Sequence, residues 1–484
     1  MSKLRSVCTS TLSLLLLAAS SASAQGTVKV GILHSLTGTM AISEITVANA
    51  AQLAIDEINA KGGVMGRKIM VVKEDGASDW PTFATKAEKL LTQDKVAAVF
   101  GGWTSASRKS MLPVFEKNGG LLFYPVQFEG NECSPNIIYT GAQPNQQALP
   151  ALEWALSKGY KKIFLLGSDY VYPRTANLIL KKHIAAKKAT LSGEEYVALG
   201  GTEFSSVINK IKAAKPDVII NTLNGDSNVS FFKQYQAAGY KASTLPVISF
   251  SIAEQEAQAI GTQLLNGQYA TWNYFQSLPN PANKKFVAAY QKKYGAGAAI
   301  TDPMAHAYMD VYLWKAAVEK AKSFDPMAVR KAIVGISMDS PLGKITVAPN
   351  GSLTQAVYTG VSGGGGSSRS SRRVRAWSRR SRTTSSPSPA RPARKPPRLS
   401  GTREAASRSF CVPLTLSRRE DGLHFYFRSA VHGPVGRVDP AAGCAGPRAE
   451  LRADARDQHG ARRIPDGRRV PHVPRRAVGR SDPG

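Results

Sequence analysis

Residues 25–360 contain one cysteine and lack the signatures of common catalytic or metal sites. Cys133 is the only cysteine there, so no disulfide can form within this stretch. His34, His183 and His306 are scattered, and no HExxH or CxxC motif accompanies them. A Walker lysine, a GxSxG elbow and a GxGxxG turn are also missing. We therefore expect no metal, no cofactor and no catalytic residue.

The chain also lacks an apolar run long enough to span a membrane. Residues 12–19 are apolar but too short for a span, and Lys3 and Arg5 precede them. The small residues Ala-Ser-Ala at 22–24 form a cleavage site before Gln25. This pattern predicts a signal peptide at residues 1–24 and a periplasmic protein that does not itself span the membrane.

What the sequence does contain is an alternation of short apolar strands and helices. The clearest unit begins with the apolar run Val96–Phe100, turns at two glycines, and offers Thr104 or Ser105 as N-cap of a helix that reaches roughly to Asn118. This alternation predicts βαβ units with right-handed crossovers. Further helices are expected at residues 47–60, 82–91, 149–157, 204–214 and 227–238.

The periodic part of the chain is too long for one core, so we expect two lobes. The predicted fold class is α/β, with two Rossmann-like lobes joined by a hinge and a disordered tail. The chain should cross between the lobes near residues 139–144 and again near 274–279. The predicted boundaries are 25–140 for the first part of the N-lobe, 141–273 for the C-lobe, 274–345 for the N-lobe return, 346–360 for a truncated C-lobe closing segment and 361–484 for the tail.

Polar loops follow the predicted strands, at the edge where open α/β sheets bind ligands. Without a catalytic motif, these loops favour capture of a small polar solute by hinged closure over turnover. The loops lie at residues 34–38, 75–80, 125–130, 168–174, 223–228 and 251–256.

Several of these segments resemble one family. Six segments are similar to the substrate-binding protein of bacterial urea ABC transporters. They are VKVGILHSLTGTM, EDGASDWPTFATKAEKLLTQDKVAAVFGGWTSASRK, LLFYPVQFEGNECSPNIIYTGAQPNQQ, LLGSDYVYPRTAN, INKIKAAKPDVIINTLNGDSN and WNYFQS. That family belongs to the type I periplasmic binding proteins and is related to a cytosolic amide sensor. The resemblance runs from about Thr27 to Tyr358 and implies a Venus-flytrap fold, permease subunits as partners, and urea or a short amide as ligand.

The resemblance also implies a set of ligand-binding residues. The matching motifs place first-lobe contacts in the loops after the third and fourth strands, and second-lobe contacts in the SDY turn and the loops that follow. Urea has four N–H donors and one carbonyl acceptor, so its site needs several acceptors and one or two donors. The expected residues are Trp103, Thr104, Ser105, Tyr124, Gln127, Phe128, Tyr170, Asn224, Asp226, Ser249 and Glu254.

After residue 360 the basic residues change type. Residues 1–360 contain 31 Lys and 5 Arg, whereas residues 361–484 contain 1 Lys and 26 Arg. Such a tail ordinarily indicates disorder and nucleic-acid binding. However, Arg, Pro, Gly and Ala have GC-rich codons, so out-of-frame translation of a GC-rich gene gives the same composition.

The tail can indeed be back-translated into family-like sequence in other frames. One choice of codons for residues 366–371 contains Gln-Phe-Glu-Val-Val, close to the family's closing motif. Another choice for residues 457–464 contains Ile-Asn-Met-Ala-His-Gly-Glu, which resembles a permease subunit of the same transporter class. We interpret the tail as a frameshift product and expect no nucleic-acid partner.

Other functional classes remain open at this point. A cytosolic ligand sensor would need no export signal, and a short-chain amide or branched-chain amino-acid binding protein would share the fold and the signal. A nucleic-acid binder would show salt-sensitive affinity. An enzyme is the remotest alternative, since Asp169 and Asp226 follow strands but no nucleophile accompanies them.

Overall fold

The computed structural model describes residues 26–363, 377–383, 416–419 and 422–425. The predicted signal peptide at residues 1–24 and most of the Arg-rich tail lie outside these ranges. Within the described residues, no helix combines the length and the apolarity needed to cross a membrane.

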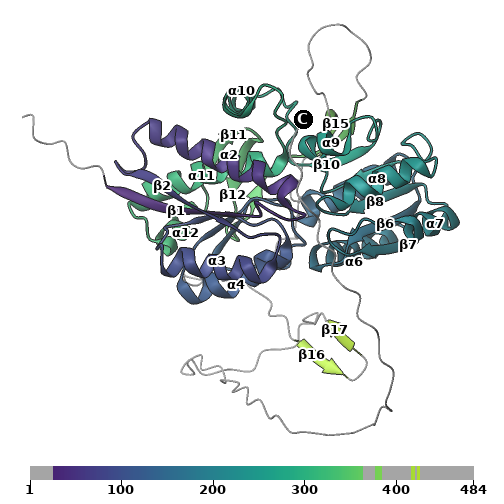
Figure 1. The fold of residues 1–484 in the computed structure, drawn as a ribbon, viewed down its shortest axis with the longest axis horizontal. Helices are drawn as coiled ribbons and strands as arrows, with labels where there is room; N and C mark the ends of the chain where they lie inside the picture. Colours follow the sequence, from purple (N-terminus) through teal and green to yellow (C-terminus); the bar gives the residue numbers. More distant parts are fainter. Residues whose placement is uncertain (1–25, 364–376, 384–415, 420–421, 426–484) are drawn as a thin grey trace, which may run out of the picture. The chain divides into compact units, whose positions relative to one another are not determined.

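The first lobe is built on a parallel five-stranded sheet with the order β2-β1-β3-β4-β5. Helix α11 packs against α2, and α3 packs against α4 (Figure 1). The strands are β1 (Thr27–His34), β2 (Lys68–Asp75), β3 (Val99–Gly101), β4 (Leu122–Tyr124) and β5 (Ile137–Tyr139). The helices are α2 (Ala41–Ala60), α3 (Trp80–Thr92), α4 (Ser105–Asn118), α10 (Pro281–Tyr294), α11 (Asp302–Ala321) and α12 (Pro326–Ile333).

The second lobe is built on a seven-stranded sheet with the order β15-β14-β10-β9-β8-β6-β7. Strands β6 to β10 pair in parallel, whereas β14 is antiparallel to both β10 and β15. The strands are β6 (Lys162–Ser168), β7 (Thr190–Val197), β8 (Val218–Thr222), β9 (Val247–Ser249), β10 (Tyr269–Trp272), β14 (Val357–Ser362) and β15 (Trp377–Thr383). The helices are α5 (Ala148–Ser157), α6 (Val171–Ala186), α7 (Ser205–Ala214), α8 (Ser227–Ala237) and α9 (Glu254–Ile260).

Four further short elements belong to the first compact unit, residues 1–411, and a hairpin lies in the second, residues 412–484. The strands β11 (Ser337–Ser340), β12 (Gly343–Val347) and β13 (Leu353–Thr354) form an antiparallel sheet, and η1 (Pro144–Gln146) is a 3-10 turn. The hairpin consists of β16 (Leu416–Arg419) and β17 (Gly422–Phe425).

Part of the region predicted as a tail carries strands that the structure describes. Strand β14 continues past residue 360 to Ser362, and β15 adds an edge strand to it. A disordered tail was predicted from residue 361 onward; its described segments are these strands and the hairpin of β16 and β17, and the disorder stays a prediction. Cys133 is disulfide-bonded, which agrees with the expectation because that expectation excluded only pairs within residues 25–360.

The connections between the two sheets lie side by side and are joined by side-chain hydrogen bonds. Gln146 Nε2 donates to the carbonyl of Leu353 at 2.7 Å, and Asn273 Nδ2 donates to the carbonyl of Ala356 at 2.8 Å. Three stretches far apart in sequence therefore meet, near residues 140–147, 273 and 347–357. Two α/β lobes with this connectivity confirm the predicted fold class.

Candidate functional site

The loop after β3 brings a tight turn and a capped helix to the carboxyl edge of the first sheet. Gly101 passes so close to β1 that an added Cβ would lie 1.9 Å from the carbonyl oxygen of Leu33, which explains why glycine stands there. Thr104 is the N-cap of α4, and its hydroxyl accepts a hydrogen bond from the Ser107 amide at 3.0 Å. This cap starts the helix at Ser105, two residues after Trp103, and so fixes the position of Ser105.

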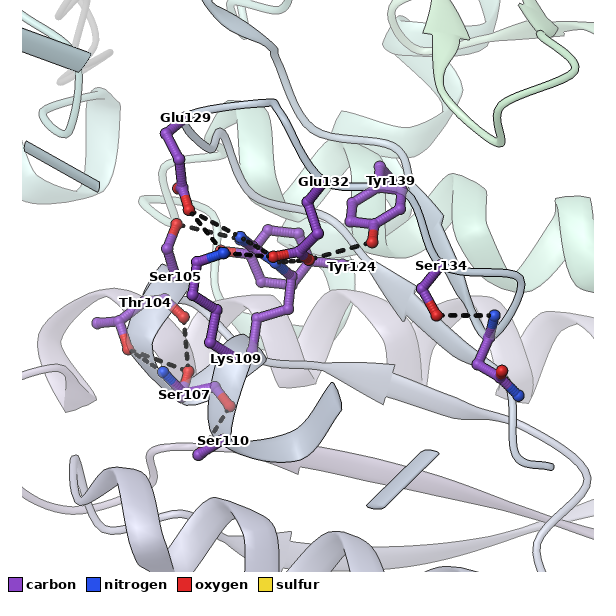
Figure 2. A network of polar contacts seen from close by, with 12 residues as sticks. Thr104, Ser105, Ser107, Lys109, Ser110, Tyr124, Glu129, Glu132, Ser134 and Tyr139 are labelled. Atoms are coloured by element: carbon purple, nitrogen blue, oxygen red, sulfur yellow. Dashed lines mark hydrogen bonds and ion pairs between the residues drawn. The ribbon is translucent and has the colours of Figure 1, made fainter. Parts of the chain in front are cut away.

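A buried ion cluster lies on the first turns of α4 (Figure 2). Arg108 is fully buried and donates from Nε to Glu132 at 2.7 Å, and from its Nη2 atom to Glu129 at 3.1 Å. Its Nη1 atom donates to Ser105 Oγ at 3.0 Å, and Lys109 Nζ donates to Glu132 at 2.6 Å. Two cations thus face two carboxylates, so the cluster is close to electrically neutral.

Aromatic rings enclose the Arg108 guanidinium. Its central carbon lies 4.8 Å from the ring centroid of Tyr124 and 4.8 Å from that of Phe128. The Phe128 ring in turn stacks on Tyr139 at 4.9 Å, and the Tyr124 hydroxyl donates to the carbonyl of Trp103. The predicted residues Ser105, Tyr124 and Phe128 therefore surround one cation.

The cluster changes the acidity of its members. Burial alone would raise the pKa of Glu132, but the charge and hydrogen bonds of Arg108 and Lys109 outweigh it and lower the pKa to about 2. Burial raises the pKa of Tyr124, and burial likewise raises that of Tyr170, so both phenols stay protonated at neutral pH. The site thus offers neutral hydroxyls and the ionised, paired carboxylate of Glu132.

Several predicted residues meet across the interface of the lobes. Trp103 Nε1 donates to Asn224 Oδ1 of the second lobe at 3.0 Å. Gln127 Nε2 donates to the carbonyl of Phe250 at 2.8 Å. Tyr170, at the start of α6, packs with Tyr172 against Ala106 of the first lobe. Residues from the two lobes thus form one buried interface.

Two polar pairs also join the first lobe to the second. Their first-lobe partners lie in α2 and in the turn before it. Ser43 Oγ donates to Glu256 Oε1 at 2.7 Å, and both side chains are buried. The Thr39 hydroxyl donates to Asp226, the residue before α8, which is exposed. Asp226 is therefore at an exposed position in this structure, although it was expected to bind ligand.

Ser249 and one oxygen of Glu254 have hydrogen-bond partners, whereas Glu254 Oε2 is buried without a partner among the described residues. Ser249 Oγ accepts from Asn221 Nδ2 at 3.1 Å, and Glu254 Oε1 accepts from the Gln276 amide at 2.7 Å. Burial raises the pKa of Glu254 to about 8. Among the described residues, no hydrogen bond joins either side chain to the predicted first-lobe residues, and their ligand contacts stay a prediction.

Two further buried oxygens, both in the loop after β4, lack a partner. Gln127 Oε1 and Glu129 Oε2 make no hydrogen bond to any residue that the structure describes. An unpaired buried acceptor is costly, so each position favours a donor supplied by another molecule. Both atoms would accept an N–H or O–H.

Arg108, Glu129 and Tyr172 were not predicted from the sequence. Several of their contacts join residues that lie far apart in the sequence. The spacing of motifs does not reveal such contacts. One signal was available for Arg108, because residues 1–360 contain only 5 arginines beside 31 lysines, and one of them follows the hydroxyl loop directly. An arginine there favours bidentate or stacked contacts that lysine makes poorly.

The comparisons with known proteins agree with this architecture. Residues 28–370 match the model of the periplasmic binding protein domain. The chain is 27% identical to Leu/Ile/Val-binding protein homolog 7 of Brucella melitensis, over 68% of this chain and 86% of the relative. It is also 27% identical to the Leu/Ile/Val-binding protein BraC3 of Rhizobium johnstonii, over 69% of this chain and 91% of the relative.

A solved structure shows the same fold. A solute-binding protein of an ABC transporter from R. palustris, in complex with 4-hydroxybenzoate, has a TM-score of 0.64 and 25% sequence identity, and covers 70% of this chain and 94% of that chain. These relatives are binding proteins, which confirms the prediction that the chain is not an enzyme. The two-lobe fold and a match that covers more than two thirds of the sequence show that the chain belongs to the periplasmic binding protein domain family.

Proposed function

We propose that this protein captures a small nitrogen-containing solute between its two lobes and delivers it to the permease subunits of an ABC importer. Family membership supports the binding role, and the solute-binding protein of R. palustris is described as part of an ABC transporter. Capture of this kind needs two lobes that close on the solute. The hydrogen bonds from Trp103 to Asn224 and from Gln127 to Phe250 are the contacts that closure would form.

The observation that carries the ligand class is the unpaired Gln127 Oε1 atom at the interface of the lobes. The same side chain is fixed by its donation to Phe250, so the amide oxygen has a defined direction. A solute N–H would satisfy that oxygen, whereas a carboxylate oxygen would repel it. The solute should therefore present an amino or amide nitrogen to Gln127.

Two ligand classes fit this requirement. Branched-chain amino acids are the first, because the names of the Brucella and Rhizobium relatives support them better than any amide. Urea and short-chain amides are the second. The near-neutral charge of the Arg108 cluster supports an uncharged solute, since no surplus cation there would bind a carboxylate. None of the relatives named above is described as a urea-binding protein.

Calorimetric titration of the full chain separates these classes. Leucine, isoleucine, urea and acetamide are titrated in turn into the same protein at neutral pH. The proposal predicts saturable heat with one class and none with the other. A folded sample that gives no heat with any of the four would contradict the proposed ligand class.

We also propose that the residues after about 361 arise from a change of reading frame in the gene. The shift from lysine to arginine at this point supports it, and the family match ends at residue 370. Resequencing the gene from independent DNA tests the proposal. An uninterrupted frame encoding these same residues, with no insertion or deletion near Thr359 or Gly360, would contradict it.

A further inference from the structure

Glu129 differs from its neighbour Glu132 because one of its carboxylate oxygens is unpaired. Its Oε1 atom accepts from Arg108 at 3.1 Å and lies 3.5 Å from Lys109 Nζ. Its Oε2 atom is buried and has no partner within the described part of the chain. Both oxygens of Glu132, in contrast, accept from Arg108, at 2.7 and 3.2 Å. Figure 2 shows the Glu129 side chain at the edge of the cluster.

The unpaired oxygen belongs to a side chain at the interface of the lobes. The negative charge of Glu129 acts on the phenols of Tyr170 and Tyr172 in the second lobe, where it adds to the effect of burial in raising their pKa values. The cluster that these tyrosines form with Ala176 packs against Ala106, in the first turn of α4. A second unpaired acceptor of this loop, Gln127 Oε1, is only two residues away. Two unmatched acceptors therefore lie on one short segment between the lobes.

The rest of the cluster fixes the Glu129 carboxylate. Arg108 is buried, stacked between two rings, and tied to Ser105 as well as to both glutamates. Such a bonded guanidinium holds a carboxylate in one orientation, so the free oxygen is preorganised before a solute arrives. Preorganised acceptors penalise any solute that cannot donate to them, which is a source of specificity.

We propose that Glu129 determines specificity by accepting an N–H of the captured solute through its free carboxylate oxygen. This inference rests on the proposed function, because it assigns a role within the same site. Solutes with an ammonium or amide group are selected. Anionic aromatic acids without a nitrogen are rejected, because their carboxylate oxygens would face the acceptors of Glu129 and Gln127.

The test compares the full chain with its Glu129→Gln variant by calorimetry at neutral pH. The probes are leucine, urea, acetamide and 4-hydroxybenzoate. A glutamine can keep one oxygen toward Arg108 but presents an NH₂ group where the free oxygen stood. We expect the affinity for the nitrogen-containing probe that binds to fall by at least about tenfold, as for the loss of a hydrogen bond to a charged group. The ratio of that affinity to the affinity for 4-hydroxybenzoate should fall as well.

Asp310→Asn is the matched control. Asp310 is also buried, and it also has one unpaired oxygen among the described residues. Its other oxygen accepts from Thr140 at 3.0 Å, directly after β5. Burial raises the pKa of Asp310 to about 7, so part of this carboxyl is already uncharged at neutral pH. Its change to an amide, outside the loop after β4, should leave affinity within about threefold of the unaltered protein. A tenfold loss in this control as well would overturn the specific role of Glu129.

The outcomes separate this inference from the proposed function. A folded Glu129→Gln variant that binds as tightly as the unaltered protein overturns the role of Glu129 and leaves the proposed function standing. No binding of any nitrogen-containing probe by the unaltered protein overturns both. If Glu129→Gln does not fold, Glu129→Asp replaces it, because it keeps the charge but withdraws the oxygen by one methylene. Unchanged affinity in that variant would also overturn the inference.

Discussion

At the scale of single residues, the most consequential feature is a cation buried with two carboxylates at the proposed site. Arg108 lies beneath the lobe interface, with no exposed side-chain surface, and takes part in contacts with Ser105, Glu129 and Glu132. Burial of such charges is tolerated only when each has its partner. The cluster therefore couples the stability of the first lobe to the geometry of the ligand site.

Removing one member of this cluster should destabilise the protein in a pH-dependent way. Glu132→Gln leaves Arg108 partly uncompensated, so we expect a loss of about 3 kcal/mol in the free energy of unfolding at pH 7. The folded pKa of Glu132 is about 2 and its ordinary value is 4.5. The stabilisation is therefore fully present above pH 4.5 and is lost as the pH falls toward 2.

Guanidinium denaturation of both proteins between pH 3 and pH 7 measures this difference. Urea is unsuitable as the denaturant because it is a candidate ligand. The gap between the two free energies should narrow as the pH is lowered. A gap that stays constant across this range would show that the Glu132 charge does not provide the stabilisation.

At this scale, the sequence predicted contacts between residues close together in the chain. It did not predict contacts between residues far apart in the chain. Thr104 was one of two predicted N-caps, and it caps α4. A cap depends on neighbours within a few positions, so its signal is local. The pairing of Arg108 with Glu129 and Glu132 spans more than twenty positions and forms only when the loop after β4 folds back over α4.

At the scale of elements, the predictions were best where periodicity was strong. Helix α4 was expected to end near residue 118 and ends at Asn118. The predicted helix at 204–214 is observed as Ser205–Ala214. Strand β7 was missed, because TLSGEEYV is polar and half-buried at the sheet edge. An edge strand buries too little surface to show the apolar run by which strands were recognised.

The contact between α2 and α9 should hold the lobes together. Ser43→Ala removes the hydroxyl that donates to Glu256 across the interface. We expect the affinity for the solute to fall by at least about tenfold, mostly through faster dissociation, as for loss of one hydrogen bond to a carboxylate. Stopped-flow dissociation measurements test this.

Thr46→Val provides the control for this variant on the same helix. The Thr46 hydroxyl donates to the carbonyl of Ser43 within α2. Its removal should leave the dissociation rate unchanged. Equal rates for Ser43→Ala and the unaltered protein would exclude this contact as a stabiliser of the closed form.

Helix α11 is joined to the segment before β14 through a buried histidine. His306 Nε2 lies 2.8 Å from Gln355 Oε1, and Nδ1 lies 3.0 Å from Asp302. Burial alone would lower the pKa of His306, but the Asp302 charge and these hydrogen bonds raise it to about 9. The folded form therefore favours the charged imidazole.

Replacing this histidine should change how stability depends on pH. The raised pKa contributes up to about 3 kcal/mol of stability, fully present below the ordinary value of 6.5 and lost as the pH rises through 9. The difference in unfolding free energy between the unaltered protein and His306→Gln should therefore shrink between pH 6.5 and pH 9. Guanidinium denaturation of both proteins across this pH range measures that difference. A difference that grows with pH would contradict a raised pKa for His306.

At the scale of the whole molecule, a solute site between two lobes requires that binding and closure occur together. Each lobe carries its own sheet, and the connections between them lie side by side, as a hinge requires. The sequence predicted this architecture because strand and helix alternation repeats twice. Ligand identity depends on a few side-chain atoms at the interface, which the repeating pattern does not specify.

Small-angle X-ray scattering of the full chain, recorded during titration with the solute that binds in calorimetry, tests the central claim most directly. Capture between the lobes predicts a radius of gyration that decreases with solute and saturates at the same concentration as the heat. Leucine, urea or acetamide serves as the probe, whichever gives saturable heat. Saturable heat with an unchanged radius of gyration would contradict capture by closure of the two lobes.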